Sequence, residues 1–250
     1  MYTLKKSLGQ HFLKDEDVCR RIVDCLAQTA FTNLLEVGPG GGALTKYLVL
    51  LPGIDFKAVE LDEEKVLYLR AAFPQVAEKI IHHSFLNLQQ PYDERFAVVG
   101  NFPYNISTEI VFKVIEWRQH VDCMVGMFQK EVAQRLASKE GSKVYGVTSV
   151  LTQAFFDVEY LFDVPPTCFT PPPKVMSGVI KLVPKQVPVV IKDERRLFLL
   201  VKAAFNQRRK TLRNAVRALF EESILQEELF GTRAEQLSVQ EFAALTFRMR

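Results

Sequence analysis

Along the first two thirds of the chain, segments with the apolar spacing of a helix alternate with short apolar runs typical of strands. In residues 15–28, Val18, Ile22 and Leu26 lie on one face of a helix, and Asp15 stands at the capping position. Short apolar runs predict strands over residues 33–37, 56–60, 79–82, 96–100, 122–128, 155–162 and 177–183, with helices that end near Leu50 or cover 62–72, 106–117 and 131–136. Strands that alternate with helices predict an α/β fold whose sheet is mainly parallel, with helices on both faces.

The pattern changes after Pro184. Residues 184–188 resemble a linker, and residues 193–250 show no strand-like alternation and contain little Gly or Pro. We therefore expect two domains, a Rossmann-like domain over residues 1–184 and a small all-helical domain over residues 185–250.

The composition is that of an ordinary soluble protein, because 48% of the 250 residues are hydrophobic and 24% are charged. No apolar run is long enough for a membrane span, and the N-terminus lacks the apolar core of a signal peptide, so we expect a cytoplasmic protein. The four cysteines show no CxxC spacing and have few clustered histidines near them, so we expect no metal site.

One segment is strongly basic although the net charge is only +3. No acid interrupts its cations, which are Lys202, Arg208, Arg209, Lys210, Arg213 and Arg217. A local concentration of positive charge favours a polyanionic partner. The alternative is the solvated face of a helix.

A strand leads directly into Asn101, Phe102, Pro103 and Tyr104, and a helix follows them. Open α/β sheets bind ligands at the carboxyl ends of their strands. An amide and main-chain carbonyls at such an edge can accept hydrogen bonds from an exocyclic amine, and an aromatic ring can stack on a base, which suits a flipped-out adenine. The alternative is a simple turn with a packed tyrosine.

A glycine-rich turn follows the first strand and carries Glu36, Gly38, Gly40 and Gly42. Glycines let the main chain approach a ligand closely. Gly38, Gly40 and Ala43 also match the dinucleotide pattern G-x-G-x-x-A, so NAD is one possible ligand. Glu60, at the end of the second strand, could accept hydrogen bonds from ribose hydroxyls of either cofactor. Glu36 favours S-adenosylmethionine, because an acid would repel a pyrophosphate and suits the cationic amino-acid end of that cofactor.

With these motifs, the chain resembles the family of small-subunit ribosomal RNA adenine dimethyltransferases of the KsgA type. The matching segments are residues 9–13 (GQHFL), 36–42, 101–104, 129–136 (QKEVAQRL), 169–175 (FTPPPKV) and 205–214 (FNQRRKTLRN). The last is the most discriminating, since generic methyltransferases lack it.

The resemblance implies a class I methyltransferase sheet and a defined reaction. S-adenosylmethionine would donate two methyl groups to N6 of each of two adjacent adenosines in the 3′-terminal hairpin loop of 16S rRNA. The substrate would be a partly assembled 30S subunit, and a monomer is the default expectation. His11 and Leu13 would border the cofactor, Gly38 and Gly40 would underlie it, Glu60 would hold its ribose and Asn101 would lie beside its sulfonium.

Ser84 departs from the family pattern. The family usually has an aspartate there, which contacts the adenine amine of the cofactor. A serine hydroxyl can accept the same hydrogen bond more weakly than a carboxylate.

The remaining implied roles concern the RNA. Asn101 and the main-chain carbonyl of Phe102 would accept the N6 hydrogens of the target, with Pro103 fixing the turn, and Tyr104 would stack on the base. Phe169 either closes the other face of the base or is a core residue. Arg208, Arg209, Lys210 and Arg213 would bind phosphates.

Three other functions share some of these features. A macrolide-resistance methyltransferase that acts on large-subunit rRNA would share the cofactor site and residues 101–104, but residues 207–214 argue against it. A non-catalytic ribosome assembly factor could keep the fold, but Glu60 and Asn101 are intact. An NAD enzyme is disfavoured by Glu36 and by the lack of an obvious hydride-transfer residue.

Overall fold

The computed structural model describes residues 11–207 and 209–250, which form two compact units. The first unit comprises the described residues up to Ala133 together with Glu159–Pro184. The second comprises Gln134–Val158 and Lys185–Arg250. In this division one boundary falls at Pro184, and residues 134–158 group with the C-terminal residues rather than with the sheet.

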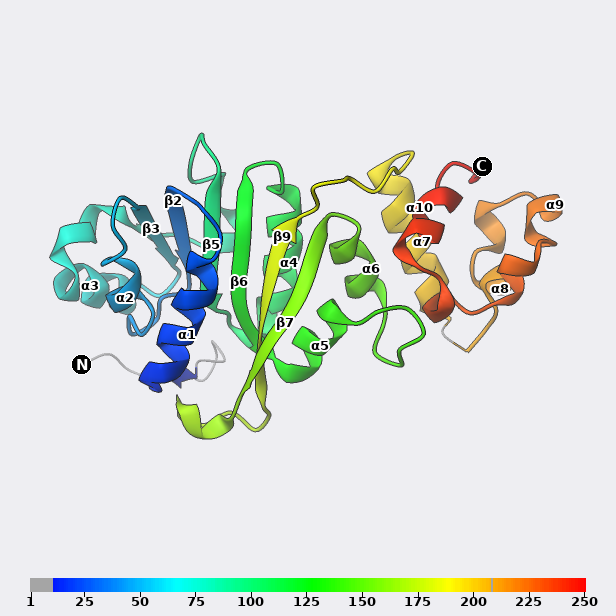
Figure 1. The fold of residues 1–250 in the computed structure, drawn as a ribbon. Helices are drawn as coiled ribbons and strands as arrows, with labels where there is room; N and C mark the ends of the chain where they lie inside the picture. Colours follow the sequence, from blue (N-terminus) through cyan, green and yellow to red (C-terminus); the bar gives the residue numbers. More distant parts are fainter. Residues whose placement is uncertain (1–10, 208) are drawn as a thin grey trace. The chain divides into compact units, whose positions relative to one another are not determined.

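A seven-stranded sheet forms the first unit's centre, with strand order β4-β3-β2-β5-β6-β9-β7 (Figure 1). Its strands are β2 (Asn33–Val37), β3 (Asp55–Glu60), β4 (Ile80–His82), β5 (Phe96–Asn101), β6 (Val121–Gln129), β7 (Phe156–Val164) and β9 (Ser177–Pro184). The strands from β4 to β6 pair in parallel, whereas β9 runs antiparallel to β6. The Rossmann-like α/β prediction is confirmed.

Helices cover both faces of this sheet. In Figure 1, α1 (Glu16–Ala27) lies in front of the strands and α4 (Ser107–Glu116) lies behind them. Asp15 caps α1 by accepting a hydrogen bond from the Val18 N–H, and the apolar face of α1 is buried at Val18, Ile22 and Leu26. The other helices that begin in this part of the chain are α2 (Thr45–Leu48), α3 (Glu63–Ala72) and α5 (Lys130–Ala137).

A second, two-stranded sheet joins the start of the described chain to the proline-rich loop. β1 (Phe12–Leu13) pairs antiparallel with β8 (Phe169–Thr170), and Leu13 lies opposite Phe169. This pairing was not predicted, because two-residue strands carry no periodic pattern. It holds His11, Phe12 and Leu13 beside the first unit's main sheet.

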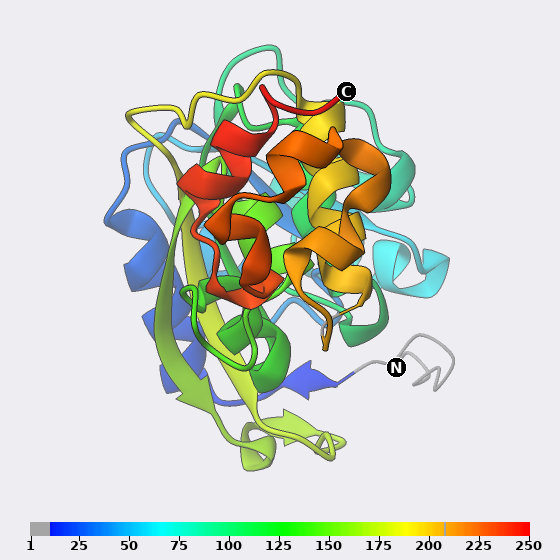
Figure 2. The ribbon, with the colours of Figure 1, turned by 90° about the vertical axis from the view of Figure 1, so that its right-hand side faces the viewer.

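The second unit is helical (Figure 2). It contains α6 (Val147–Gln153), α7 (Glu194–Asn206), α8 (Leu212–Ala215), α9 (Glu222–Leu225) and α10 (Val239–Leu245). Helix α7 contacts α6, α8 and α10. Ring centroids of Tyr145 and Phe205 lie 6.0 Å apart, and those of Phe205 and Phe242 lie 5.8 Å apart, so a shared aromatic core joins residues 134–158 to this unit.

Within the described residues, no helix has both the length and the apolar character needed to cross a bilayer. The same part of the chain contains no group of three metal-ligating side chains arranged to hold an ion.

Candidate active site

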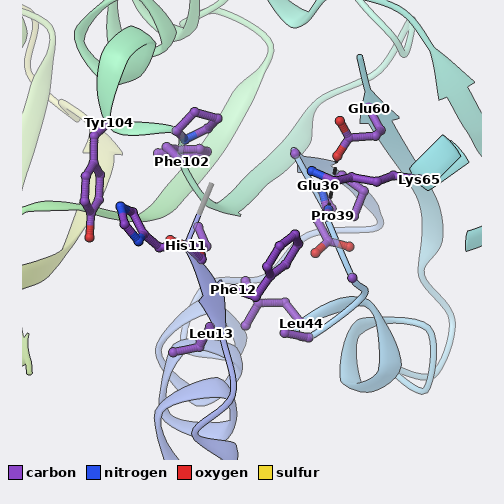
Figure 3. Close-up of a pocket in the computed structure, with 16 residues that line it drawn as sticks. His11, Phe12, Leu13, Glu36, Pro39, Leu44, Glu60, Lys65, Phe102 and Tyr104 are labelled. Atoms are coloured by element: carbon purple, nitrogen blue, oxygen red, sulfur yellow. Dashed lines mark hydrogen bonds between the residues drawn. The ribbon is translucent and has the colours of Figure 1, made fainter. Parts of the chain in front are cut away.

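A pocket opens at the carboxyl ends of β2, β3 and β5 in the first unit (Figure 3). Its lining comes from the β1 segment, the glycine-rich turn, the end of β3, the start of α3 and the turn after β5. The residues are His11, Phe12, Leu13, Glu36, Gly38, Pro39, Gly40, Gly41, Ala43, Leu44, Glu60, Lys65, Asn101, Phe102, Pro103 and Tyr104. Most of the residues expected at the site are therefore brought together here.

The glycine-rich turn requires glycine at three positions. Gly38, Gly40 and Gly42 have φ angles of +67°, +58° and +81°. A Cβ atom on Gly40 would lie 3.2 Å from the Phe12 ring, and one on Gly42 would lie 2.7 Å from the Phe73 ring. The turn is thus packed tightly between β1 and α3.

The N–H groups of these glycines are already used inside the protein. Gly38 N–H donates to the Val59 carbonyl (2.9 Å), Gly40 N–H to the Glu60 carboxylate (3.1 Å) and Gly42 N–H to the Pro39 carbonyl (2.8 Å). A pyrophosphate needs free N–H donors from such a turn. This arrangement disfavours the NAD interpretation.

Main-chain donors hold the Glu60 carboxylate in place. Its Oε1 accepts hydrogen bonds from the N–H groups of Leu61 (2.9 Å) and Asp62 (3.0 Å), and its Oε2 accepts the one from Gly40. A carboxylate has about four acceptor sites, so Oε2 keeps capacity for a further donor such as a ribose hydroxyl. Its fixed orientation suits the ribose role expected for it.

Glu36 is almost completely buried, with 1% of its surface exposed. The Thr45 hydroxyl donates a hydrogen bond of 2.7 Å to its Oε2. Burial raises the pKa of Glu36 to about 8, the Thr45 hydrogen bond opposes this shift, and the nearby Glu60 adds to it. A cationic group in the pocket would favour the ionised carboxylate.

Asn101 is oriented by the β1 segment. Its Nδ2 donates a hydrogen bond of 3.1 Å to the main-chain carbonyl of His11. The His11 ring nitrogen Nδ1 in turn lies 2.9 Å from the Pro171 carbonyl oxygen. Because this hydrogen bond turns Nδ2 toward His11, the Oδ1 atom is the part of the Asn101 amide suited to accept a hydrogen bond from a ligand.

The Phe102 side chain packs in the protein interior and does not face a ligand. Its ring is 1% exposed and lies edge-on to Phe128, with centroids 5.2 Å apart. Gly100 and Gly126, paired on β5 and β6, leave the space that the ring fills, since a Cβ on Gly126 would lie 2.2 Å from it. The ring thereby fixes the turn in which Pro103 follows Phe102.

Tyr104 is held at its hydroxyl, which lies 2.6 Å from the Ser177 hydroxyl on β9. Burial raises the pKa of the Tyr104 hydroxyl, and the Ser177 hydrogen bond opposes this shift. The centroids of the Tyr104 and His11 rings lie 5.6 Å apart. Figure 3 shows the two side chains next to each other. Together they form an aromatic wall beside Asn101.

Leu13 and Phe169 belong to the hydrophobic core. Leu13 is 4% exposed and Phe169 is 1% exposed, and both pack within the same buried cluster. Leu13 still reaches the edge of the pocket. Of the two interpretations of Phe169, the structure agrees with the core residue, since its ring has no exposed face for a base.

Ser84 lines a second cavity that adjoins the first. The two cavities share Gly38, Glu60 and Pro103. The remaining lining is mostly apolar and includes Val37, Val59, Leu61, Phe85 and Ile106. This cavity can take a flat apolar ring that carries a polar edge toward Ser84.

The basic segment follows α7 in the second unit. Arg208 lies outside the described residues, as do positions 9 and 10 of the first motif. Arg209 and Lys210 are exposed. Arg213 is partly buried, and its Nε donates a hydrogen bond of 2.6 Å to the Leu225 carbonyl, so this side chain also stabilises the fold.

The two cavities fit S-adenosylmethionine. Gly38, Gly40 and Gly41 line the first cavity without a side chain, and Glu60 offers an acceptor there. Buried Glu36 suits a cationic end, and the second cavity suits an adenine.

The comparisons with known proteins agree with this geometry. The model of the ribosomal RNA adenine dimethylase family matches residues 1–248. The chain belongs to this family. A protein of Cytophaga hutchinsonii named ribosomal RNA small subunit methyltransferase A is 52% identical over 246 residues, which cover 97% of this chain and 95% of that protein. A protein of the same name from Flavobacterium johnsoniae is 50% identical, over 97% of this chain and 94% of its own.

The fold agrees as well. The crystal structure of a dimethyladenosine transferase from Plasmodium falciparum matches with a TM-score of 0.79 and 21% identity, over 96% of this chain and 99% of that one. As a ribosomal RNA adenine dimethylase, this chain uses S-adenosylmethionine as its cofactor.

Several residues at the site of this dimethylase were not expected from the sequence. Phe12 and Lys65 line the pocket, Thr45 binds Glu36 and Ser177 binds Tyr104. Phe12 lies inside the motif of residues 9–13, so the sequence could have indicated it as a site residue. The others carry no motif, and only the tertiary fold brings them to the site.

Proposed function

We propose that this chain dimethylates N6 of two adjacent adenosines in the 3′-terminal hairpin loop of 16S rRNA during small-subunit biogenesis. The family that it belongs to is named for adenine dimethylation, and its relatives are named as small-subunit rRNA methyltransferases. The observation that carries the proposal is the fixed Asn101 amide at the pocket edge, flanked by the Tyr104 ring.

The chemistry starts from a weak nucleophile. The lone pair of adenine N6 is delocalised into the ring. Bound S-adenosylmethionine supplies an electrophilic methyl group on a sulfonium. When Asn101 Oδ1 and the Phe102 carbonyl accept the two N6 hydrogens, they draw the nitrogen toward tetrahedral geometry and make its lone pair available.

The same two acceptors stabilise the positive charge that develops on N6, and they are oriented before the reaction begins. The ring of Phe102 holds its own carbonyl in position, while Tyr104 stacks on the base and places N6 at the pocket. No strong general base is required, because an alkylated N6 loses its proton readily.

In this proposal the substrate is a partly assembled 30S subunit. The exposed cations Arg209 and Lys210, together with Arg208, bind phosphates and position the hairpin. The protein acts as a monomer in the cytoplasm.

The test is to incubate the purified protein with tritiated S-adenosylmethionine and unmethylated small subunits, and to map the label by nuclease digestion and mass spectrometry. We expect N6,N6-dimethyladenosine in the 3′-terminal hairpin. Label in large-subunit rRNA alone would favour the resistance-type activity. Tight subunit binding without any label would favour a non-catalytic assembly factor.

A further inference from the structure

Thr45 is a fully buried threonine behind the cofactor pocket. It is the first residue of α2 and follows Gly42 by three positions. Its hydroxyl donates the hydrogen bond of 2.7 Å to Oε2 of Glu36 on β2. Glu36 belongs to the pocket lining, whereas Thr45 does not. Any effect of the Thr45 hydroxyl on a ligand is therefore transmitted through the carboxyl group of Glu36.

Within the described residues, this hydroxyl is the one group that donates a hydrogen bond to Glu36. Burial disfavours the charged form of a carboxyl group, whereas a donated hydrogen bond favours it. Burial raises the pKa of Glu36 to about 8, and the hydrogen bond from Thr45 limits this rise. The hydroxyl thus fixes one carboxyl oxygen and makes ionisation of the group easier.

The other titratable groups near Glu36 do not provide this help. Glu60 on β3 adds to the rise in the pKa of Glu36. On α1, burial raises the pKa of the Cys19 thiol to about 12, so the thiol stays neutral. The pocket lining also contains the titratable side chains of His11, Lys65 and Tyr104. Of the interactions that shift the pKa of Glu36, the hydrogen bond from Thr45 is the one that lowers it.

We propose that Thr45 is a positioning residue for the cofactor, because its hydroxyl orients Glu36 and stabilises the carboxylate that binds the cationic amino-acid end of S-adenosylmethionine. The inference rests on the proposed function and adds a residue that acts behind its cofactor site. On binding, the Glu36 carboxyl group releases its proton to the solvent. The carboxylate then accepts charge-assisted hydrogen bonds from the ligand's ammonium group and from the Thr45 hydroxyl.

The test is the pH dependence of the affinity for S-adenosylhomocysteine, which carries the same amino-acid end. Titration calorimetry between pH 6 and pH 9.5 measures this affinity for the wild-type protein, Thr45→Val and Thr45→Ser. The ratio of wild-type to variant affinity at each pH cancels the titration of the ligand and of the other pocket groups. Thermal melting reports whether each variant is folded.

Thr152→Val is the matched control, because it makes the same replacement at another fully buried threonine. The Thr152 hydroxyl has no hydrogen-bond partner in the described part of the chain, and Thr152 lies on α6 in the second unit. Its replacement should leave the affinity unchanged at every pH.

We expect Thr45→Val to bind about tenfold or more weakly at pH 6 to 7, the usual effect of losing a hydrogen bond to a charged group. As pH rises above 8, Glu36 becomes ionised in the free protein as well, so the ratio of the two affinities falls toward one. Thr45→Ser keeps the hydroxyl and should follow the wild-type profile. Calorimetry of the wild type at pH 7 in buffers of different ionisation enthalpy should show the release of about one proton per ligand.

Three results would overturn the role of Thr45 and leave the proposed function intact. They are an affinity ratio that stays the same at every pH, no weakening in Thr45→Val at any pH, and binding to the wild type without proton release. The first would mean that Thr45 only supports the fold around the pocket. A wild-type protein that does not bind the ligand would instead overturn the cofactor, and the proposed function with it.

Discussion

At the scale of single residues, Asn101 shows how a main-chain contact decides the chemistry of a side chain. The side-chain amide has two N–H donors and one acceptor oxygen, and the His11 carbonyl accepts a hydrogen bond from one of the donors. The segment that begins at His11 therefore orients the amide as well as bordering the pocket. The sequence placed Asn101 at a strand end, but the direction of its amide depends on a residue 90 positions earlier.

We predict that Asn101→Ala lowers turnover far more than cofactor affinity. The loss of one preorganised acceptor should cost about 100- to 1,000-fold in rate, by analogy with other polar groups that stabilise developing charge. Single-turnover methylation of small subunits measures the rate, and calorimetry measures cofactor binding. Asn87→Ala, at an exposed site outside the pocket, is the control. Equal losses in rate and in affinity would contradict the assigned role.

Ser177 positions Tyr104, because the two hydroxyls lie 2.6 Å apart. We predict that Ser177→Ala and Tyr104→Phe each weaken the binding of small subunits slightly and to the same extent, since both remove this one hydrogen bond. Tyr104→Ala should weaken subunit binding more, by about 1–3 kcal/mol, because it also removes base stacking. Filter binding measures the three affinities. Cofactor affinity serves as the internal control, and a Tyr104→Ala variant that binds subunits as tightly as Tyr104→Phe would argue against stacking.

Glu36 makes stability depend on pH. Its pKa is about 8 in the folded protein against an ordinary value of 4.5, so between these values the folded chain holds a proton that the unfolded chain has lost. The free energy of unfolding of the cofactor-free protein therefore falls as pH rises through this window, by at most about 1.4 kcal/mol per pH unit from this group. Below the window, both states are protonated and this contribution is constant.

Glu36→Gln keeps a hydrogen-bond acceptor for Thr45 and removes the titration. We predict that urea unfolding between pH 5 and pH 8 gives a shallower dependence for this variant than for the wild type. Curves that stay parallel over this range would mean that Glu36 is already ionised in the folded protein.

At the scale of elements, a pair of glycines on β5 and β6 supports the turn of residues 101–104. Strand periodicity predicted both strands, and their bounds agree with the structure within a few residues. The space that the Phe102 ring fills could not be predicted, because it depends on the parallel register that pairs Gly100 with Gly126. The two-residue strands β1 and β8 were missed for a similar reason, since only their pairing makes them strands.

We predict that Gly126→Ala destabilises the protein by about 1–3 kcal/mol, because the added methyl group would overlap the Phe102 ring. The ring and the turn after it would shift, so methylation should fall further than stability alone explains. Chemical denaturation and activity at a temperature where the variant is folded separate the two effects. Gly231→Ala is the matched control, as no atom lies within 4 Å of its added methyl group. Activity that follows only the folded fraction would leave Phe102 with a purely structural role.

At the scale of the whole molecule, the chain leaves the first unit at Gln134, returns at Glu159 and leaves again after Pro184. Of these three points, only the one after Pro184 coincides with a change in the sequence pattern. Helix α6 packs against α7, and Tyr145 packs against Phe205. These partners lie at least 41 residues apart in the chain, and such distant packing has no local sequence signal. The second unit therefore includes residues 134–158 in addition to the C-terminal residues 185–250.

The basic segment of this unit contains cations of two kinds. Arg209 and Lys210 are exposed, whereas Arg213 donates to the Leu225 carbonyl. We predict that the double variant Arg209→Gln/Lys210→Gln reduces the slope of log affinity for small subunits against log salt concentration by about 1.5, since each phosphate contact contributes about 0.7–0.9. Arg213→Gln should instead lower the melting temperature, because the Leu225 carbonyl loses its donor.

Filter binding over a series of salt concentrations gives the slopes. The double variant Arg195→Gln/Arg233→Gln is the matched control, because it removes two exposed arginines of the same unit that lie outside the basic segment. The control should keep the wild-type slope, and all variants should keep the wild-type affinity for S-adenosylmethionine, whose pocket belongs to the first unit. An unchanged slope in Arg209→Gln/Lys210→Gln would mean that these two cations do not contact phosphates, and the solvated helix face would then be the better interpretation of this segment.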